Sequence, residues 1–502
     1  MLFSWDMLFQ GFATALTPYN VFFAFIGCLI GTLVGVLPGI GPTSGIAILL
    51  PLTTVLPPIP AIIMMAAIYY GAMYGGSTTA IVVNIPGEAA SVPTALDGYE
   101  LAKQGRAGPA LGIAAIGSFV AGTLSLFGVT FFAPMLAGVA LAFGPPEYFA
   151  LMFMALSLVV SLSEKALVKG LAGMCLGLLS SLIGMDPFTG TTRLTFGSST
   201  LIAGVNFVAV VIGLFAFGEL FVNVERQITH IYGTRIKDWM PTWRDIRETW
   251  VSMVRGSGVG FFLGLLPGCG PAVSTFVSYD VEKRFSKHPE RFGKGAMEGV
   301  AGPESANNAG SCSQFIPLLA FGIPPGPTLA MLLGALMMYG LQPGPRLWTE
   351  QPQLVWSTIA SMYIGNVMLL ILNLPLVGFW ARIALIPFPI LGPLIVVFSL
   401  IGAYSVRYLL FDVWSALLFG VIGYFMRKFG FPLAPVVLAV ILAPQLEIAL
   451  KQSLALSQGS YQIFFNRPIA LVFMILALGV IARGLWQQYR SRRLEFTEEE
   501  AD

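Results

Sequence analysis

One twelve-residue motif occurs twice in the chain, and each copy interrupts a run of apolar residues. The first copy is Gly-Thr-Leu-Val-Gly-Val-Leu-Pro-Gly-Ile-Gly-Pro at 31–42, and the second is Gly-Phe-Phe-Leu-Gly-Leu-Leu-Pro-Gly-Cys-Gly-Pro at 260–271. Proline removes a backbone donor and collides with the preceding helical turn, and glycine weakens the helix further. We therefore expect one helix to stop near Pro38 and another near Pro267.

The surrounding apolar runs have about the 20-residue length that a helix needs to cross a bilayer. The 502 residues are 56% hydrophobic and only 10% charged, whereas soluble proteins carry about 25% charged residues. The sequence therefore predicts an all-α polytopic membrane protein embedded in a lipid bilayer. The net charge of +2 does not indicate nucleic-acid binding, because the basic residues lie between the apolar runs.

The two motifs divide the chain into two halves of similar pattern. Each half is predicted to hold an interrupted hairpin, a broken span and about four ordinary helices, with one extra helix at the C-terminal end. The broken spans are expected at 60–95, interrupted within 69–80 and again at 84–88, and from 302 to 326. The predicted divisions are a first membrane repeat at 1–222, a cytoplasmic amphipathic connector at 223–257, a second membrane repeat at 258–450, and the extra helix with a charged tail at 451–502.

The distribution of basic residues predicts the orientation of the halves. Lys and Arg accumulate in cytoplasmic loops, and 11 of the 27 basic residues lie between Arg226 and Lys294. If this segment is cytoplasmic, the first hairpin opens outward and the second opens inward. We therefore expect two inverted-topology repeats, with the N-terminus in the periplasm and the C-terminus in the cytoplasm.

The helix breaks also predict where a ligand binds. Backbone groups freed within a membrane need protein, water or a ligand as partners, and paired interrupted segments in two halves are typical of a transporter's binding site. Helix N-termini attract anions, and neutral polar side chains near a break add donors. The candidate substrate-binding residues are Thr43, Ser44, Ser77, Thr78, Thr79, Asn84, Ser274, Thr275, Ser305, Asn307, Asn308 and Ser311.

A cation site is predicted at the same breaks, because unwound carbonyls suit Na⁺. The candidate cation-binding residues are Leu37, Gly39, Gly41, Leu266, Gly268, Gly270 and Glu304. Glu88 is a further acid close to a break; an intramembrane acid favours a functional role, although it and Glu304 could instead lie at the interface. No cofactor and no metal other than the transported cation is expected.

Other interpretations of these motifs remain open. Glycine lets membrane helices pack closely, so the motifs could serve packing alone, and single hydroxyls often bond between helices. A polytopic intramembrane enzyme would need a catalytic dyad or metal triad, and the spans hold no Ser–Lys, paired Asp or His–Glu set. A passive anion channel is the third reading, but inverted breaks suit alternating access better than an open pore. We therefore predict a transporter and no enzymatic activity.

With these motifs, the chain resembles the large permease subunit of the tripartite tricarboxylate transporters, the TctA family. The resemblance rests on 31–42, Ala-Leu-Asp-Gly-Tyr at 95–99, 260–271, Phe-Gly-Lys-Gly at 292–295, and Pro-Glu-Ser-Ala-Asn-Asn at 303–308. It implies a secondary transporter of the bacterial inner membrane that imports a di- or tricarboxylate by symport with a cation, expected to be Na⁺. It also implies two partners, a small four-helix membrane subunit and a periplasmic solute-binding protein.

Overall fold

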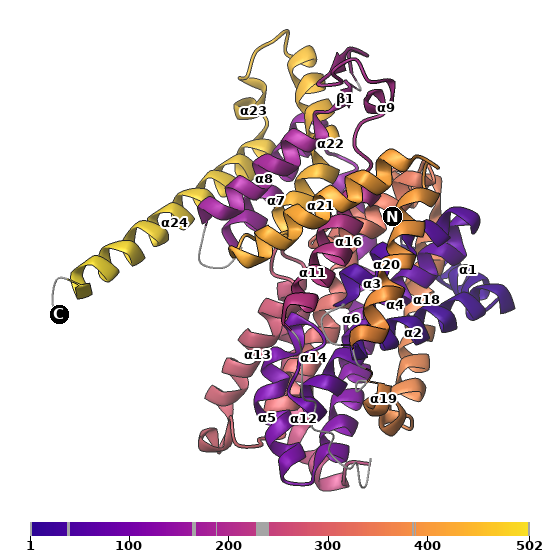
Figure 1. Ribbon diagram of the computed structural model, residues 1–502, viewed down its shortest axis with the longest axis vertical. Helices are drawn as coiled ribbons and strands as arrows, with labels where there is room; N and C mark the ends of the chain where they lie inside the picture. Colours follow the sequence, from indigo (N-terminus) through magenta and orange to yellow (C-terminus); the bar gives the residue numbers. More distant parts are fainter. Residues whose placement is uncertain are drawn as a thin grey trace.

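The computed structural model describes residues 3–37, 41–162, 167–186, 188–226, 240–383, 386 and 388–499. This part of the chain is almost entirely helical, and eight of its helices are long and apolar enough to cross a membrane. The predicted all-α polytopic membrane fold is therefore confirmed. Figure 1 shows β1, α9 and α23 together at one end of the molecule, α5, α12 and α13 at the other, and α24 extending away from the remaining helices.

The first half of the chain builds a helical bundle and a small β-hairpin. Its elements are α1 (Trp5–Ala15), α2 (Pro18–Val36), α3 (Gly41–Leu49), η1 (Leu50–Val55), α4 (Pro58–Val83), η2 (Ala89–Ser91), α5 (Val92–Lys103), α6 (Ala107–Ala140), α7 (Pro145–Leu162), α8 (Leu167–Ser181), β1 (Gly184–Met185), β2 (Thr192–Arg193), α9 (Ser199–Ile202), α10 (Phe207–Val211), the π-helical turn η3 (Ile212–Phe217) and α11 (Gly218–Arg226). Strands β1 and β2 pair antiparallel, with Gly184 opposite Arg193.

The second half continues as helices alone among the described residues. Its elements are α12 (Trp243–Gly264), α13 (Pro271–Phe285), η4 (Pro289–Arg291), α14 (Glu298–Ser313), α15 (Phe315–Phe321), α16 (Pro327–Met338), α17 (Pro345–Glu350), α18 (Pro352–Asn373), α19 (Val377–Ile383), α20 (Phe388–Ser405), α21 (Leu410–Lys428), α22 (Ala434–Leu456), α23 (Ile463–Asn466) and α24 (Pro468–Glu499).

Both repeated motifs break a helix, as predicted. In the first copy α2 ends at Val36 and α3 begins at Gly41, whose φ of +66° suits glycine; Pro38, Gly39 and Ile40 lie outside the described residues. In the second copy α12 ends at Gly264 and α13 begins at Pro271. The first motif therefore separates α2 from α3, and the second separates α12 from α13 by a non-helical stretch at 265–270.

The glycines before each break let two helices pack at backbone distance. On α2, a Cβ at Gly31 would lie 2.5 Å from the carbonyl oxygen of Ile68 on α4, and on α12 a Cβ at Gly260 would lie 2.3 Å from the oxygen of Ala306 on α14. The glycines one turn before and after make the same kind of contact in both halves: Gly27, Gly35, Gly256 and Gly264. The two halves thus repeat one helix–helix contact, in which only glycine fits.

The first broken span is interrupted at 84–88, as predicted, but not within 69–80. Helix α4 runs without interruption through Gly71, Gly75 and Gly76, and the break lies after it, where Asn84 takes a φ of +56°. The physical reason is packing: a Cβ at Gly75 would lie 2.3 Å from the oxygen of Thr32, so α4 uses its glycines to approach α2. In the second half, α15 ends in the same way at Gly322, with a φ of +72°.

Two further boundaries differ from the sequence-based expectation. The apolar runs predict two ordinary spans of the first half near 110–130 and 133–160, whereas the structure has one 34-residue helix, α6, which contains Pro134, and the shorter α7. The boundary expected at residue 257 falls inside α12, which runs continuously from Trp243 into the second interrupted hairpin. The residues between Arg226 and Met240 lie outside the described part, so the connector is described only at its ends.

Candidate functional site

A cavity of about 820 Å³ lies between the two broken hairpins. Its wall includes residues of the first hairpin, the loop after α4, the π-helical turn with α11, the second hairpin, and the ends of α16 and α21. The lining residues are Gly41, Pro42, Thr43, Ser44, Tyr69, Met73, Ile85, Pro86, Gly87, Glu88, Ala89, Ala90, Val92, Phe215, Glu219, Asn223, Gly268, Gly270, Pro271, Ala272, Val273, Pro327, Thr328 and Arg427. Both repeated motifs therefore border the same space.

Three helices begin at this cavity. They are α3 at Gly41, α13 at Pro271 and α16 at Pro327. A helix N-terminus carries unpaired N–H groups and a partial positive charge. Because these N-termini come from three separate segments, the cavity wall favours an anion. A second cavity of about 420 Å³ shares Gly268, Gly270 and Pro327 with the first, so the second break borders both cavities.

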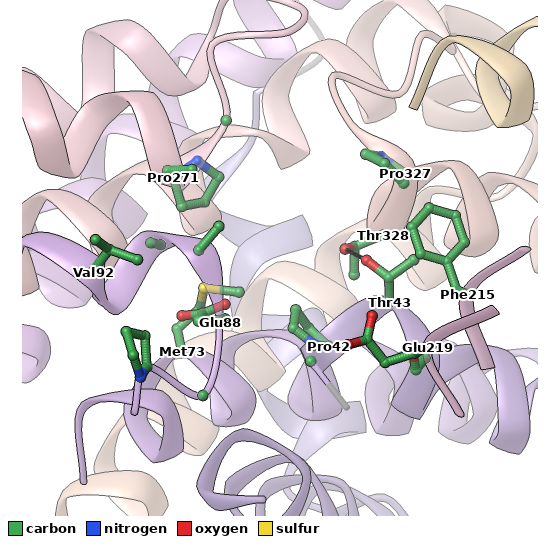
Figure 2. A pocket seen from close by; sticks show the side chains of 18 of the residues that line it. Pro42, Thr43, Met73, Glu88, Val92, Phe215, Glu219, Pro271, Pro327 and Thr328 are labelled. Carbon is green, nitrogen blue, oxygen red and sulfur yellow. Dashed lines mark hydrogen bonds between the residues drawn. The ribbon is translucent and has the colours of Figure 1, made fainter. Parts of the chain in front are cut away.

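One end of the cavity carries a hydroxyl pair and an ion pair. The Oγ1 atoms of Thr43 and Thr328 lie 2.8 Å apart and form a hydrogen bond between the first hairpin and α16. Arg427 on α21 forms an ion pair with Glu219 on α11, and its guanidinium lies 5.9 Å from the ring centroid of Phe215. Figure 2 shows Thr43, Thr328, Phe215 and Glu219 grouped on one side in that view, with Glu88 and Met73 on the other. Arginine recognises carboxylates through its planar donors.

The opposite end of the cavity leads into a polar cluster made by both halves. Glu88 accepts a hydrogen bond of 3.0 Å from Nδ2 of Asn307 on α14. One turn earlier on α14, the fully buried Glu304 accepts hydrogen bonds from the hydroxyls of Ser77 and Thr94, the latter at 2.5 Å. Two helices of the first half thus supply the donors for a carboxylate of the second.

The structure brings part of the predicted site together. Thr43, Ser44, Gly41, Gly268 and Gly270 line the cavity. Three further predicted residues belong to the polar cluster beside it, and these are Ser77, Asn307 and Glu304. The predicted set therefore contributes residues from both hairpins and from both broken spans.

The other predicted residues face their own helices or lie elsewhere. Thr79, Ser274, Thr275 and Ser311 donate to carbonyl oxygens three or four residues earlier. Asn308 donates to Ser118 at 2.6 Å. Thr78, Leu37 and Ser305 are buried, and Ser305 has no hydrogen-bond partner among the described residues. Asn84 follows the last residue of α4, and Leu266 is 47% exposed. Gly39 lies outside the described residues.

Sequence reasoning missed the side chains that α11 and α21 bring to the cavity. Arg427 ends a long apolar run and is followed by Lys428, a pattern typical of the cytoplasmic end of a span. Glu219 is the one acidic residue within the apolar run 202–222, and an acid inside a membrane span is a functional signal. That lone acid was the available indication that this helix contributes to the site.

Comparison with protein families gives a match to the tripartite tricarboxylate transporter TctA family over residues 21–438. The chain belongs to the TctA family. This is a transporter family, whose members act with a small membrane subunit and a periplasmic binding protein in tripartite systems. This TctA-family chain is therefore a multi-pass membrane protein that takes part in transmembrane transport.

Two proteins of Agrobacterium vitis are similar to this TctA-family chain. One, described as an uncharacterized 52.8 kDa protein in the TAR-I ttuC' 3' region, is 46% identical over 486 residues, which is 96% of each chain. The other, described as an uncharacterized protein in the TAR-II ttuC' 3' region, is 46% identical over 234 residues, or 47% of this chain and 97% of the relative. No solved structure matched the chain.

Proposed function

We propose that this chain is the permease of a secondary active transporter that imports an organic di- or tricarboxylate across the bacterial inner membrane. Family membership makes it a transport protein, and the site supports an anionic cargo. The observation that carries the proposal is that both Pro-Gly-x-Gly-Pro breaks, far apart in sequence, border one 820 Å³ cavity. Breaks of this kind supply binding groups at the membrane midplane in other transporters.

The cavity offers three kinds of partner to a carboxylate. The N-termini of α3 and α13 provide N–H groups and partial positive charge. Thr43 and Thr328 provide hydroxyl donors. Arg427 provides a full positive charge, at present matched by Glu219. A carboxylate of the cargo would compete with Glu219 for Arg427, so that Arg427 keeps an anionic partner while Glu219 gives up this ion pair.

Alternating access follows from the proposed arrangement of the halves as inverted repeats. The repeated glycine contacts of α2 on α4 and of α12 on α14 support a common unit in both halves. The basic residues between Arg226 and Lys294 support a cytoplasmic location for that segment. The N-terminus would then be periplasmic and the C-terminus cytoplasmic, with one hairpin open to each side.

Transport would be coupled to a cation, which we propose is Na⁺, and the cargo would be delivered by a periplasmic solute-binding protein. A small four-helix membrane subunit would complete the system. An anion that enters the cell against a negative interior potential needs compensating charge, because each elementary charge is worth about 2.3 kcal/mol per 100 mV. A co-transported cation supplies that compensation.

Uptake by proteoliposomes tests this proposal. The chain is reconstituted with its small subunit, and the binding protein is supplied outside with labelled carboxylates, starting with citrate. Accumulation against a gradient that needs an inward Na⁺ gradient is the expected result. Equilibration without accumulation would instead support a passive anion channel, and chemical conversion of a membrane substrate by the purified chain would support an enzyme.

A further inference from the structure

The polar cluster behind Glu88 contains two buried oxygen atoms without partners. Asn307 is fully buried, and while its Nδ2 donates to Glu88, its Oδ1 has no hydrogen-bond partner among the described residues. Ser91, one turn after Glu88 and also fully buried, has a hydroxyl with no described partner. An acceptor oxygen left unsatisfied in a buried site costs about 1–3 kcal/mol, so each requires an explanation.

The hydroxyl of Ser91 and the carboxylate of Glu88 lie close together over a single glycine. A Cβ placed on Gly76 of α4 would lie 2.7 Å from Oγ of Ser91, 3.0 Å from Cγ of Glu88 and 3.4 Å from its Oε1. The absence of a side chain at Gly76 therefore allows the hydroxyl and the carboxylate to share one small space. Glu88 also lines the large cavity, so this space can be reached from it.

Negative charge in this cluster is not balanced by the protein. The carboxylates of Glu88 and Glu304 have neutral donors, Asn307 for the first and Ser77 and Thr94 for the second. Neither forms an ion pair with a described Lys, Arg or His. Arg427, the basic residue of the cavity, is paired with Glu219. Glu304 is fully buried and Glu88 is half-buried, and a carboxylate withdrawn from bulk water favours a cation beside it.

We propose that Glu88, Asn307 and Ser91 form a binding site for a dehydrated monovalent cation of the Na⁺ class. The carboxylate of Glu88, Oδ1 of Asn307 and Oγ of Ser91 are hard oxygen donors, and water from the cavity completes the shell. With one carboxylate among its ligands, the site favours a single positive charge, whereas Ca²⁺ prefers 6–8 oxygens with several carboxylates. The site differs from the backbone carbonyls expected from the sequence.

The cation site rests on the proposed function and specifies how carboxylate transport is coupled to the cation. Glu88 comes from the break loop of the first half and Asn307 from α14 of the second, so the cation bridges the halves. A cation at Glu88 also adds positive charge to the cavity in which the carboxylate binds. Each ligand therefore strengthens the binding of the other, which is the reciprocal coupling that symport needs.

Equilibrium binding of radioactive sodium to the purified full chain in lipid nanodiscs tests the site. No carboxylate and no partner subunit is present, so the result does not depend on transport. The wild type is expected to show one saturable site. Glu88→Gln and Asn307→Ala are each expected to raise the Kd by about tenfold or more, and Gly76→Ala, which fills the shared space, is expected to do the same.

The matched control is Glu147→Gln, because Glu147 on α7 is also buried but caps the backbone N–H of Gly144 elsewhere. It should bind sodium like the wild type. If Glu88→Gln does not elute as a folded, monodisperse protein, Ser91→Ala replaces it and should weaken binding. Absence of saturable sodium binding in the wild type, or wild-type affinity in the folded Glu88 or Ser91 variant, would overturn the site. Proton-driven carboxylate uptake without sodium binding would overturn the site and the Na⁺ coupling, and leave the proposal of carboxylate transport standing.

Discussion

The carboxylate of Asp97 on α5 accepts a 2.8 Å hydrogen bond from the backbone N–H of Gly295, in the turn that precedes α14. The same oxygen accepts another from the N–H of Ala296, and the second oxygen accepts one from the hydroxyl of Tyr279. Asp97 is fully buried and belongs to the first half, whereas its three donors belong to the second. This contact joins the halves at the end of the molecule opposite β1 (Figure 1).

Removing that carboxylate should destabilise the protein. Asp97→Ala leaves two backbone N–H groups without a partner, and we expect a loss of about 2–4 kcal/mol, visible as a lower melting temperature in detergent. The control is Asp280→Ala on α13, whose side chain is 58% exposed and pairs with Arg284; it should change stability by less than about 0.5 kcal/mol. Equal melting of the Asp97 variant and the wild type would show that this contact does not hold the halves together.

The glycine contact between α12 and α14 predicts a second stability difference. Gly260→Ala places a methyl group 2.3 Å from the carbonyl oxygen of Ala306, which forces the helices apart at an expected cost of about 1–3 kcal/mol. Gly258, on the same helix, has no atom within 4 Å of its Cβ position, so Gly258→Ala should be neutral or stabilise by up to about 1 kcal/mol. Thermal unfolding of the two variants side by side measures this, and a reversed order would contradict the packing described for α12.

Arg427 and Lys428 are neighbours with different environments, and they predict different effects on cargo binding. Arg427 faces the cavity, whereas Lys428 pairs with Glu225 on the outside of α11. In a binding assay with a transported carboxylate, Arg427→Gln should raise the Kd by about tenfold or more, while Lys428→Gln should leave it unchanged. Glu219→Gln should lower the Kd, because it removes the carboxylate that competes with the cargo. Equal effects at 427 and 428 would exclude Arg427 from the cargo site.

The environment of Asp186, in the hairpin between β1 and β2, predicts how the stability of the protein depends on pH. A hydrogen bond from Lys451, together with one from the N–H of Phe188, holds the pKa of Asp186 well below its ordinary value of 3.8. A lowered pKa means that the contribution of Asp186 to stability is present above the ordinary pKa and is lost as the pH falls below it. The melting difference between wild type and Asp186→Asn should therefore be constant from about pH 5 to about pH 8 and shrink below about pH 4. A difference that changes near neutral pH would assign the effect to another group.

The parts of the fold that sequence could predict are those where residue type dictates backbone geometry. Pro38 and Pro267 each stand beside two glycines, and this combination stops a helix, whereas the single Pro134 stays inside α6. Both breaks were therefore foreseeable, and with them the cavity residues of the hairpins. Gly75 and Gly76 were interpreted as another break, because glycine both weakens a helix and permits close packing. The contact between α2 and α4 shows that these glycines serve close packing and do not break the helix.

The side chains contributed by distant helices could not be located in this way. Arg427 and Phe215 reach the cavity because α21 packs against the π-helical turn, and no local pattern fixes that contact. Similarly, Asn307 and Asn308 are adjacent polar residues in one motif, yet the helix directs one to Glu88 and the other to Ser118. Successive residues on a helix point in different directions, so sequence could mark the pair and not assign its roles.

Protection from thiol labelling tests the account most directly. Cys28, Cys175, Cys269 and Cys312 are replaced, and single cysteines are introduced by Thr43→Cys in the first hairpin and by Ala272→Cys in the second, both at the cavity wall. If one carboxylate site is shared by both breaks, the same transported carboxylate, tested from a panel that begins with citrate, should slow the labelling of both cysteines over one concentration range. Protection of one cysteine alone, or of neither by any di- or tricarboxylate of the panel, would contradict a common site.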